Sequence, residues 1–292
     1  MSLLAFNVLL APVDRRLPVL LPASPTNCLP PFRDPRHDDQ APTPRDRAPE
    51  QTAMSDDEKE RRQQRYAVAW TDYLASEATP DGHLVTGHVA ALLARDGSAA
   101  GARVFVDLGC GTGALYADLG AAGVAIGTYF GVDSNAALIQ KARAEAGESA
   151  RFAVADLADA AEQARVIDQA IGIAGAARCV FTLVRVLNYL PDGAASALLG
   201  ALASRAPGAH AIILDIYPER AGRPRQDDPL QSLADHEVMG GADITHHLRD
   251  PFQYVDFLSA RGVRALCARS TYLRGSEAPS HFVISCRFGT ES

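Results

Sequence analysis

A glycine-rich segment carries the residues best suited to bind a ligand. Residues 104–114 read Val-Phe-Val-Asp-Leu-Gly-Cys-Gly-Thr-Gly-Ala, an apolar run followed by closely spaced glycines and then a helical pattern. Glycines at Gly109, Gly111 and Gly113 allow a tight turn and let a ligand lie against the backbone. Backbone N–H groups at the start of the following helix favour an anionic or electron-rich group.

Carboxylates follow two further apolar runs in the same way. Asp133 ends the run at residues 129–132, where a carboxylate suits the two hydroxyls of a ribose. Asp156 follows the run at residues 152–154 and is placed to accept a hydrogen bond from the amino group of an adenine. Because the carboxyl ends of parallel strands meet at one edge of a sheet, we expect these acids to lie near the glycine segment.

Two kinds of nucleotide ligand compete for this site. The pattern Gly-x-Gly-x-x-Ala from Gly109 to Ala114 formally matches the dinucleotide fingerprint, which leaves an NAD(P)-linked oxidoreductase as an alternative. Asp107 would repel a pyrophosphate close to this loop and would attract an ammonium group. S-adenosylmethionine (SAM) has an ammonium group, a sulfonium, a ribose and an adenine but no phosphate. Its parts therefore match Asp107, Asp133 and Asp156.

At these residues the sequence resembles the class I SAM-dependent methyltransferase family, over about residues 55–288. The matching segments are Val106–Gly113, Phe130–Ser134, Ala155–Leu157, Leu187–Asp192 and Ala206–Asp215. The resemblance implies an α/β, Rossmann-like fold with a seven-stranded mixed sheet, the last strand antiparallel and helices on both faces. It also implies SAM as the cofactor, with these binding residues: Asp107, Gly109, Gly111 and Gly113 at the methionine end, Asp133 and Ser134 at the ribose, and Asp156 and Leu157 at the adenine.

The rest of the chain alternates short apolar runs with helical patterns, as in a parallel sheet covered on both faces. Strands are expected at residues 104–108, 129–132, 152–154, 179–184 and 211–216. One helix should run from Ser134, as its N-cap, to a stop at Gly147, and another should open at Pro251 and close at Gly262. Two final strands, near residues 263–272 and 281–288, are expected to pair antiparallel.

Domain organisation follows from changes in composition. Ten of the 18 prolines fall between Pro12 and Pro49, so residues 1–53 are interpreted as a disordered extension. Residues 54–292 are expected to form the methyltransferase domain that the resemblance implies, and this domain should begin with a helical extension predicted from the period of residues 66–74. Residues 218–249 are polar and show no clear period, and we interpret them as an insertion on the substrate side.

Methyl transfer needs a general base only if the acceptor atom is protonated. The candidates are His246, His247 and Tyr217, which lie on or after the fifth strand, near the open end of the sheet. Asp215 is interpreted as a structural or substrate-facing acid. No metal is expected, because the segment after the fourth strand, residues 182–188, has no carboxylate.

Composition limits the expected class of acceptor substrate and the expected cellular compartment. A net charge of −7 argues against nucleic acid as the acceptor, and Asn188-Tyr189 does not match the motif of DNA amino-methyltransferases. The expected acceptor is therefore a small molecule, such as a secondary metabolite. Five scattered cysteines and the lack of a membrane-length apolar run indicate a cytoplasmic protein. A non-catalytic SAM-binding relative stays open as a further alternative. The oligomeric state and the methylated atom (O, N, C or S) stay open as well.

Overall fold

The computed structural model describes residues 57, 61, 80–96, 104–216, 230–239, 242–271 and 281–289. All of them lie within one unit of the chain, Gln51–Ser292. Three expectations fall outside the described residues: the extension 1–53, the helical pattern of residues 66–74, and Tyr217. No described helix combines the length and the apolar character that crossing a membrane requires.

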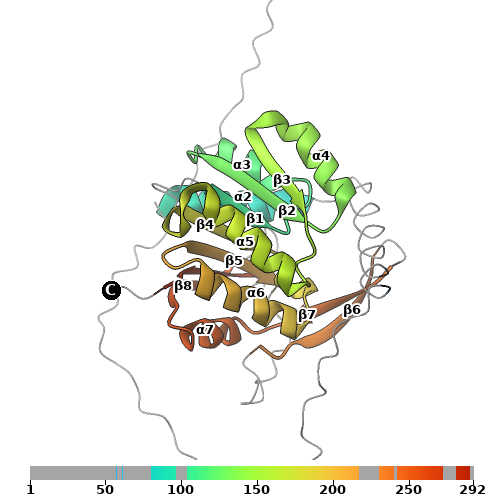
Figure 1. Ribbon diagram of the computed structural model, residues 1–292. Coiled ribbons are helices and arrows are strands. Elements are labelled where there is room, and N and C mark those ends of the chain that lie inside the picture. The colour runs from blue at the N-terminus through green and yellow to red at the C-terminus, as the bar shows by residue number, and fades with distance from the viewer. Residues whose placement is uncertain are drawn as a thin grey trace, which may run out of the picture. The chain divides into compact units, whose positions relative to one another are not determined.

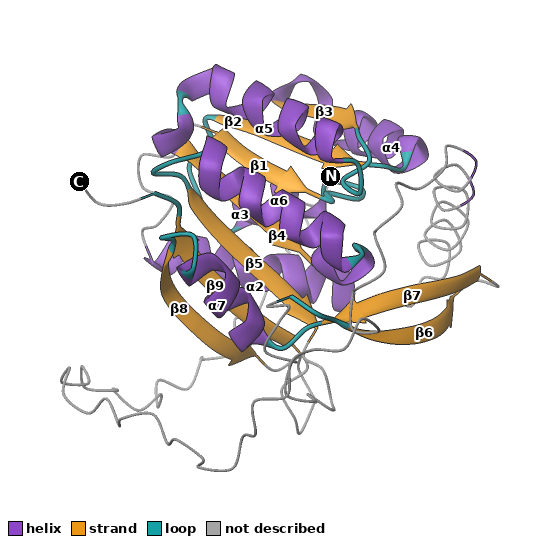
Figure 2. Ribbon diagram, turned by 60° about the horizontal axis from the view of Figure 1, so that its bottom comes forward, coloured by secondary structure: helices purple, strands orange, loops and turns teal. Residues whose placement is uncertain are grey.

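Seven of the described strands form one sheet in the spatial order β3-β2-β1-β4-β5-β9-β8 (Figures 1 and 2). The first five strands are parallel, whereas β9 pairs antiparallel with both β5 and β8. The strands are β1 Val104–Leu108, β2 Thr128–Asp133, β3 Ala150–Val154, β4 Cys179–Val184, β5 His210–Ile216, β8 Arg264–Thr271 and β9 His281–Arg287. The predicted Rossmann-like mixed sheet and its antiparallel last strand are confirmed. The strand order reverses between β1 and β4, where sheets of this kind bind ligands.

Helices cover both faces of the sheet (Figure 2). The helices are α2 Pro80–Asp96, α3 Ala114–Ala121, α4 Ala136–Ala146, α5 Ala160–Ala174, α6 Asp192–Arg205 and α7 Pro251–Ser259, with short 3₁₀ turns η2 Gly147–Ser149, η3 Ala176–Arg178 and η4 Leu187–Tyr189. Apolar residues of α5, α6 and α7 share one buried core with Val104 and Val106 of β1. Residues of α2, α3 and α4 share the other core with Phe105. Alternate residues of each strand thus enter opposite cores.

Side-chain caps fix where α4, α5 and α7 begin. The prediction that Ser134 caps α4 is wrong: Asn135 Oδ1 accepts from two backbone N–H groups of the first turn, at 2.9 and 3.3 Å. An Asn oxygen caps as well as a Ser oxygen, so sequence alone could not separate the two neighbours. The predicted stop at Gly147 is confirmed, with φ +62. Helix α7 opens with a capping box at Asp250 but ends before the predicted stop, Gly262.

A β-hairpin, which the sequence did not predict, lies between β5 and α7. Strands β6 Leu233–Met239 and β7 Ala242–Leu248 pair antiparallel as a separate two-stranded sheet. The sequence of residues 218–249 showed no clear period, and both strands lie in the described part of this segment. The two strands lack the apolar–polar alternation that normally predicts strands, because they form no part of the main sheet. Strand β7 contacts η4, so the hairpin lies at the carboxyl end of β4.

Candidate active site

The glycine loop after β1 is attached to β2 through its backbone. The N–H groups of Gly109 and Cys110 both donate to the carbonyl oxygen of Val132, at 2.7 and 2.9 Å. Gly109 has φ +79, and a Cβ there would lie 2.6 Å from Val186 Cγ2, so only glycine suits the position. By contrast, within the described part of the chain and apart from its two chain neighbours, no atom lies within 4 Å of the place where a Cβ of Gly111 would stand. The backbone of Gly111 is therefore open to close approach by a ligand.

Asp133 joins the glycine loop to the start of α4. Its Oδ2 accepts from Gly111 N and its Oδ1 accepts from Asn135 N, both at 2.9 Å. Burial raises the pKa of the Asp133 carboxyl, and the bonds from backbone N–H groups limit the rise. Asp133 and the neighbouring Ser134 are only partly buried. The carboxylate thus shapes the loop and still reaches its surface, as a ribose-binding acid must.

Asp107 is buried inside β1. Its two carboxylate oxygens accept hydrogen bonds from the Tyr129 hydroxyl and from Thr182 Oγ1, the latter at 2.9 Å. Burial raises the pKa of Asp107 to about 6, against the lowering effect of these two bonds. Asp107 is 3% exposed. The role of Asp107 at the methionine end of SAM stays a prediction. The structure adds that its carboxylate is buried and hydrogen-bonded within the protein.

The loop after β3 completes the predicted cofactor side. Asp156 Oδ1 accepts from Ala158 N at 2.9 Å, which forms a tight turn. The carbonyl oxygen of the buried Leu157 accepts from Gln163 Nε2 of α5 at 2.7 Å. Val154, the last residue of β3, is 45% exposed. This edge therefore offers a polar group and an uncovered apolar side chain, the two features that an adenine requires.

The predicted acceptor side lies where β5, β7 and η4 come together. His246 of β7 is buried, and its ring centroid lies 5.0 Å from that of Tyr189. His246 Nδ1 lies 3.1 Å from the side-chain amide of Asn188. That amide also lies 3.1 Å from Asp215 Oδ1. Asp215 is buried within β5 and accepts from the Tyr254 hydroxyl at 3.0 Å.

Burial raises the pKa of Asp215 to about 6, and hydrogen bonds from Ile216 N and from Tyr254 act in the opposite direction. The cations of Arg249 and Arg185 also lower it. Asp215 therefore acts within the protein, as a buried anchor. Of its two predicted roles, the geometry favours the structural one.

The two candidate histidines point to different surroundings. His247 Nδ1 lies 3.2 Å from Ser232 Oγ, away from the contacts of His246. Neighbouring residues of a strand face opposite sides, so the pair cannot act as one unit. The third candidate, Tyr217, lies outside the described residues.

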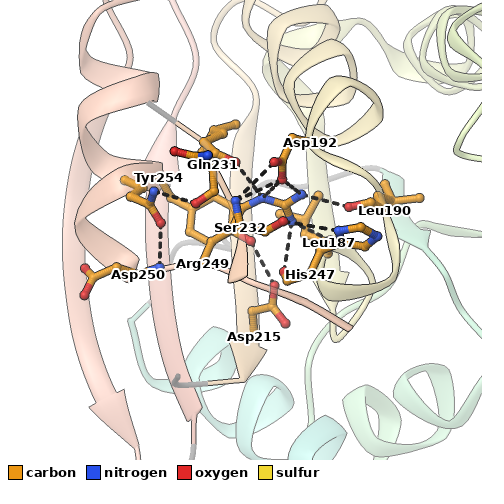
Figure 3. Close-up of polar contacts among 12 residues, drawn as sticks. Leu187, Leu190, Asp192, Asp215, Gln231, Ser232, His247, Arg249, Asp250 and Tyr254 are labelled. Carbon is orange, nitrogen blue, oxygen red and sulfur yellow. Dashed lines mark hydrogen bonds and ion pairs between the residues drawn. The ribbon is translucent and has the colours of Figure 1, made fainter. Parts of the chain in front are cut away.

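Arg249, directly after β7, connects the hairpin to η4 and α6 (Figure 3). Its guanidinium is fully buried and pairs with Asp192 Oδ1 at 2.6 Å. It also donates to four backbone carbonyl oxygens, those of Leu187, Leu190, Leu230 and His247, at 2.8–3.2 Å. Leu187 and Leu190 flank Asn188, and His247 follows His246. Arg249 thus holds together the two segments that carry the acceptor-side groups.

Sequence reasoning missed three parts of this arrangement. It did not predict the contact between Asn188 and His246 or the hydrogen bond between Thr182 and Asp107. It also assigned no role to Arg249. Each pairing joins segments far apart in the chain, for example Thr182 and Asp107, so only the strand order brings them together. One signal was present: Gly240-Gly241, between two seven-residue segments, is typical of a hairpin connection.

Comparisons with known proteins agree with this geometry. Residues 105–188 match the family described as methyltransferase domain. The structure of DhpI in complex with SAM and HEP is 18% identical, with a TM-score of 0.52, covering 78% of this chain and 96% of that chain. A SAM-dependent methyltransferase from Leishmania major is 10% identical, with a TM-score of 0.51, covering 78% of this chain and 82% of that one. No curated protein sequence is similar to this chain.

The matched segment contains the glycine loop, Asp133 and Asp156, and it ends at Asn188. The structural likeness covers 78% of this chain in each case and shows the same fold. Residues 105–188 therefore match a methyltransferase domain, and the chain shares its fold with solved structures of SAM-dependent methyltransferases.

Proposed function

We propose that this protein transfers the methyl group of SAM to a small-molecule acceptor whose proton is taken by His246. The observation that carries the proposal is the set of three acids, Asp107, Asp133 and Asp156, around one open glycine loop. Three carboxylates repel the pyrophosphate of a dinucleotide and suit the ammonium, ribose hydroxyls and adenine amino group of SAM. This argues against the NAD(P)-linked alternative.

The described residues fit SAM on the cofactor side. Gly111 presents open backbone, Asp133 reaches the loop surface, and Val154 offers an apolar side chain near Asp156. We assign Asp107 and the glycines to the methionine end, Asp133 with Ser134 to the ribose, and Asp156 with Leu157 to the adenine. When bound, SAM supplies a methyl group already activated by the sulfonium. The protein must position the acceptor atom and exclude water from the site.

On the acceptor side we assign the base role to His246 and not to His247. His246 is buried and lies against Tyr189 and Asn188 at the ends of the sheet strands, where an acceptor would approach a methyl group on the cofactor side. His247 faces Ser232 instead. Tyr217 stays a prediction. General-base assistance is worth roughly 10²–10⁴-fold in rate.

A small molecule is the proposed acceptor, because the chain is acidic and nucleic acid binding needs a basic surface. A buried acceptor-side histidine also suits a compact substrate better than a polymer. We propose that the protein works in the cytoplasm, where its scattered cysteines stay reduced.

Ligand-dependent thermal stability tests the cofactor proposal directly. At about a hundred times its dissociation constant, a ligand stabilises the folded state by about 2.7 kcal/mol, which is readily measured. SAM and S-adenosylhomocysteine should each raise the melting temperature, and NADH and NADPH should not. Calorimetry with the same four compounds gives the affinities. Stabilisation by NADH without stabilisation by SAM would refute the proposal.

A further inference from the structure

The orientation of the Asn188 side-chain amide can be decided from its neighbours. One end of the amide faces the carbonyl oxygen of Arg185 and Asp215 Oδ1, each at 3.1 Å. A backbone carbonyl can only accept a hydrogen bond, so the amide nitrogen must lie at this end. The amide oxygen then lies at the other end, 3.1 Å from His246 Nδ1. An amide oxygen can only accept, so His246 must donate to it.

We propose that Asn188 is a positioning residue that fixes the proton of neutral His246 on Nδ1 and leaves Nε2 as the basic nitrogen. A neutral imidazole carries one N–H, and the partner of one nitrogen decides which nitrogen holds the proton. Asp215 is the charged end of this series of hydrogen bonds. Its carboxylate requires a donor from Asn188 and so prevents the amide from turning. The order of donation is His246 to Asn188, and Asn188 to Asp215.

The surroundings keep Asn188 in this orientation. Asp215 is itself fixed by Tyr254, which donates to Oδ2 at 3.0 Å (Figure 3). The backbone N–H of Ile216 also donates to its Oδ1, at 2.8 Å. Arg185, whose carbonyl receives the second amide bond, has φ +54, a conformation that is uncommon outside glycine. Strained backbone of this kind tends to occur at functional sites.

Arg249 fixes the segments at either side. Its Nη1 donates to the carbonyl oxygen of Leu187 at 2.8 Å, and its Nη2 donates to that of Leu190 at 2.8 Å. Asn188 therefore lies between two anchored residues, and its side chain cannot leave His246 without breaking a buried network. Buried polar networks of this kind specify one arrangement when every member is satisfied.

The arrangement gives His246 a defined task, and this purpose rests on the proposed function. As the acceptor atom bonds to the methyl carbon, the carbon–sulfur bond breaks and its electron pair stays on sulfur. The proton that the acceptor loses goes to His246 Nε2. The imidazolium so formed keeps its Nδ1–H bond to Asn188, and the negative Asp215 beyond the amide favours its positive charge. The proton then leaves to solvent.

Long-range ¹H–¹⁵N spectra of protein labelled with ¹⁵N-histidine test the tautomer without any acceptor. The two nitrogens of a neutral imidazole give separate signals according to which one is protonated, and His246→Gln identifies the signals of His246 by their loss. We expect the Nδ1–H form in the wild-type protein at a pH where His246 is neutral. A wild-type spectrum in the Nε2–H form would overturn the proposal, whether or not the protein binds SAM.

Two substitutions separate positioning from general packing. Asn188→Leu keeps the bulk of the side chain and removes its oxygen, so the Nε2–H form of His246 should increase toward its share in free histidine. Gln163→Leu is the matched control: Gln163 is another buried amide with two carbonyl partners, Leu157 and Ala194, and its loss should leave the His246 signals unchanged. An unchanged tautomer in Asn188→Leu would refute the role of Asn188. If that variant does not fold, the wild-type spectrum decides alone.

Calorimetry with SAM on the same proteins keeps the two proposals distinct. A failure of SAM to bind would contradict the proposed function and leave the tautomer result valid. Binding of SAM with the Nε2–H tautomer would contradict only the inference about Asn188.

Discussion

Replacing Arg249 with methionine should destabilise the fold strongly. The substitution keeps an unbranched apolar side chain and removes the guanidinium, which pairs with Asp192 and donates to four backbone carbonyl oxygens. Removing one partner of a buried ion pair costs about 3–5 kcal/mol, largely because the other charge is left without compensation. The carbonyls also lose a donor each, although that of Leu187 keeps the N–H of Leu190. A buried group left unsatisfied costs about 1–3 kcal/mol, and such costs are not additive.

The side chain of Asp192 is 24% exposed, so water can solvate part of its charge once Arg249 is gone. The expected loss in the free energy of unfolding is therefore about 3 kcal/mol, near the lower end of the range for a broken buried ion pair. Domains of this kind are stable by roughly 5–15 kcal/mol, so the variant should still fold at room temperature. Its hairpin should be the first element to loosen, because Arg249 is its main polar connection to η4 and α6.

Urea denaturation followed by circular dichroism measures the difference. The matched control is Arg165→Met, which removes the same side chain from a pair with Glu162 on the surface of α5, where the two side chains are 47% and 38% exposed. Pairs at this spacing on a helix contribute about 0.2–0.5 kcal/mol, so the control should unfold almost as the wild type does. An Arg249→Met variant no less stable than the control would show that the buried network does not hold the hairpin.

Further substitutions test the loop and the acceptor side. Gly109→Ala should destabilise the fold by roughly 2–4 kcal/mol, from the left-handed backbone and an overpacked neighbour, whereas Gly111→Ala should cost about 1 kcal/mol because its surroundings are open. Even so, Gly111→Ala should weaken SAM binding by about tenfold or more; equal affinity in calorimetry would show that the ligand does not approach this backbone. Asp107 has a pKa of about 6, and a bound ammonium group favours its ionised form. SAM binding should therefore release protons near pH 6 and weaken as the pH falls further, and calorimetry in buffers of different ionisation enthalpy would detect this. Substituting His246 with Gln should lower turnover by roughly 10²–10⁴-fold with SAM affinity kept, while His247→Gln should leave turnover nearly unchanged; the reverse result would reassign the base.

The apolar runs in the sequence and the turn residues between them predicted most of the main sheet. The runs at residues 104–108, 179–184 and 211–216 became β1, β4 and β5, because strands buried on both faces read as continuous apolar segments. The antiparallel pair at the carboxyl end was also correct. The hairpin at residues 233–248 was missed, because it lies outside the main sheet and its strands carry polar residues on both faces.

The two sides of the site differed in how far sequence could predict them. The glycine loop and Asp133 come from one strand–loop–helix unit and the next strand, so local spacing places them near each other. His246, Asn188 and Asp215 come from three segments whose contacts depend on how the hairpin packs against η4. Nothing in their spacing predicts the hydrogen bond between His246 and Asn188, since pairing of buried polar groups is settled only when the elements pack.

The contacts of Arg249 also bear on how this protein can change over time. Four of its partners are backbone carbonyl oxygens, which every amino acid supplies, so substitutions at residues 187, 190, 230 and 247 leave these bonds available. Among the described residues, the side chains of Asp192 and Tyr254 also interact with the guanidinium, and Asp192 supplies the ion pair. Genetic drift, or a library of variants made to alter acceptor choice, can therefore explore position 247, which is only partly buried, while positions 192 and 249 should vary together or not at all.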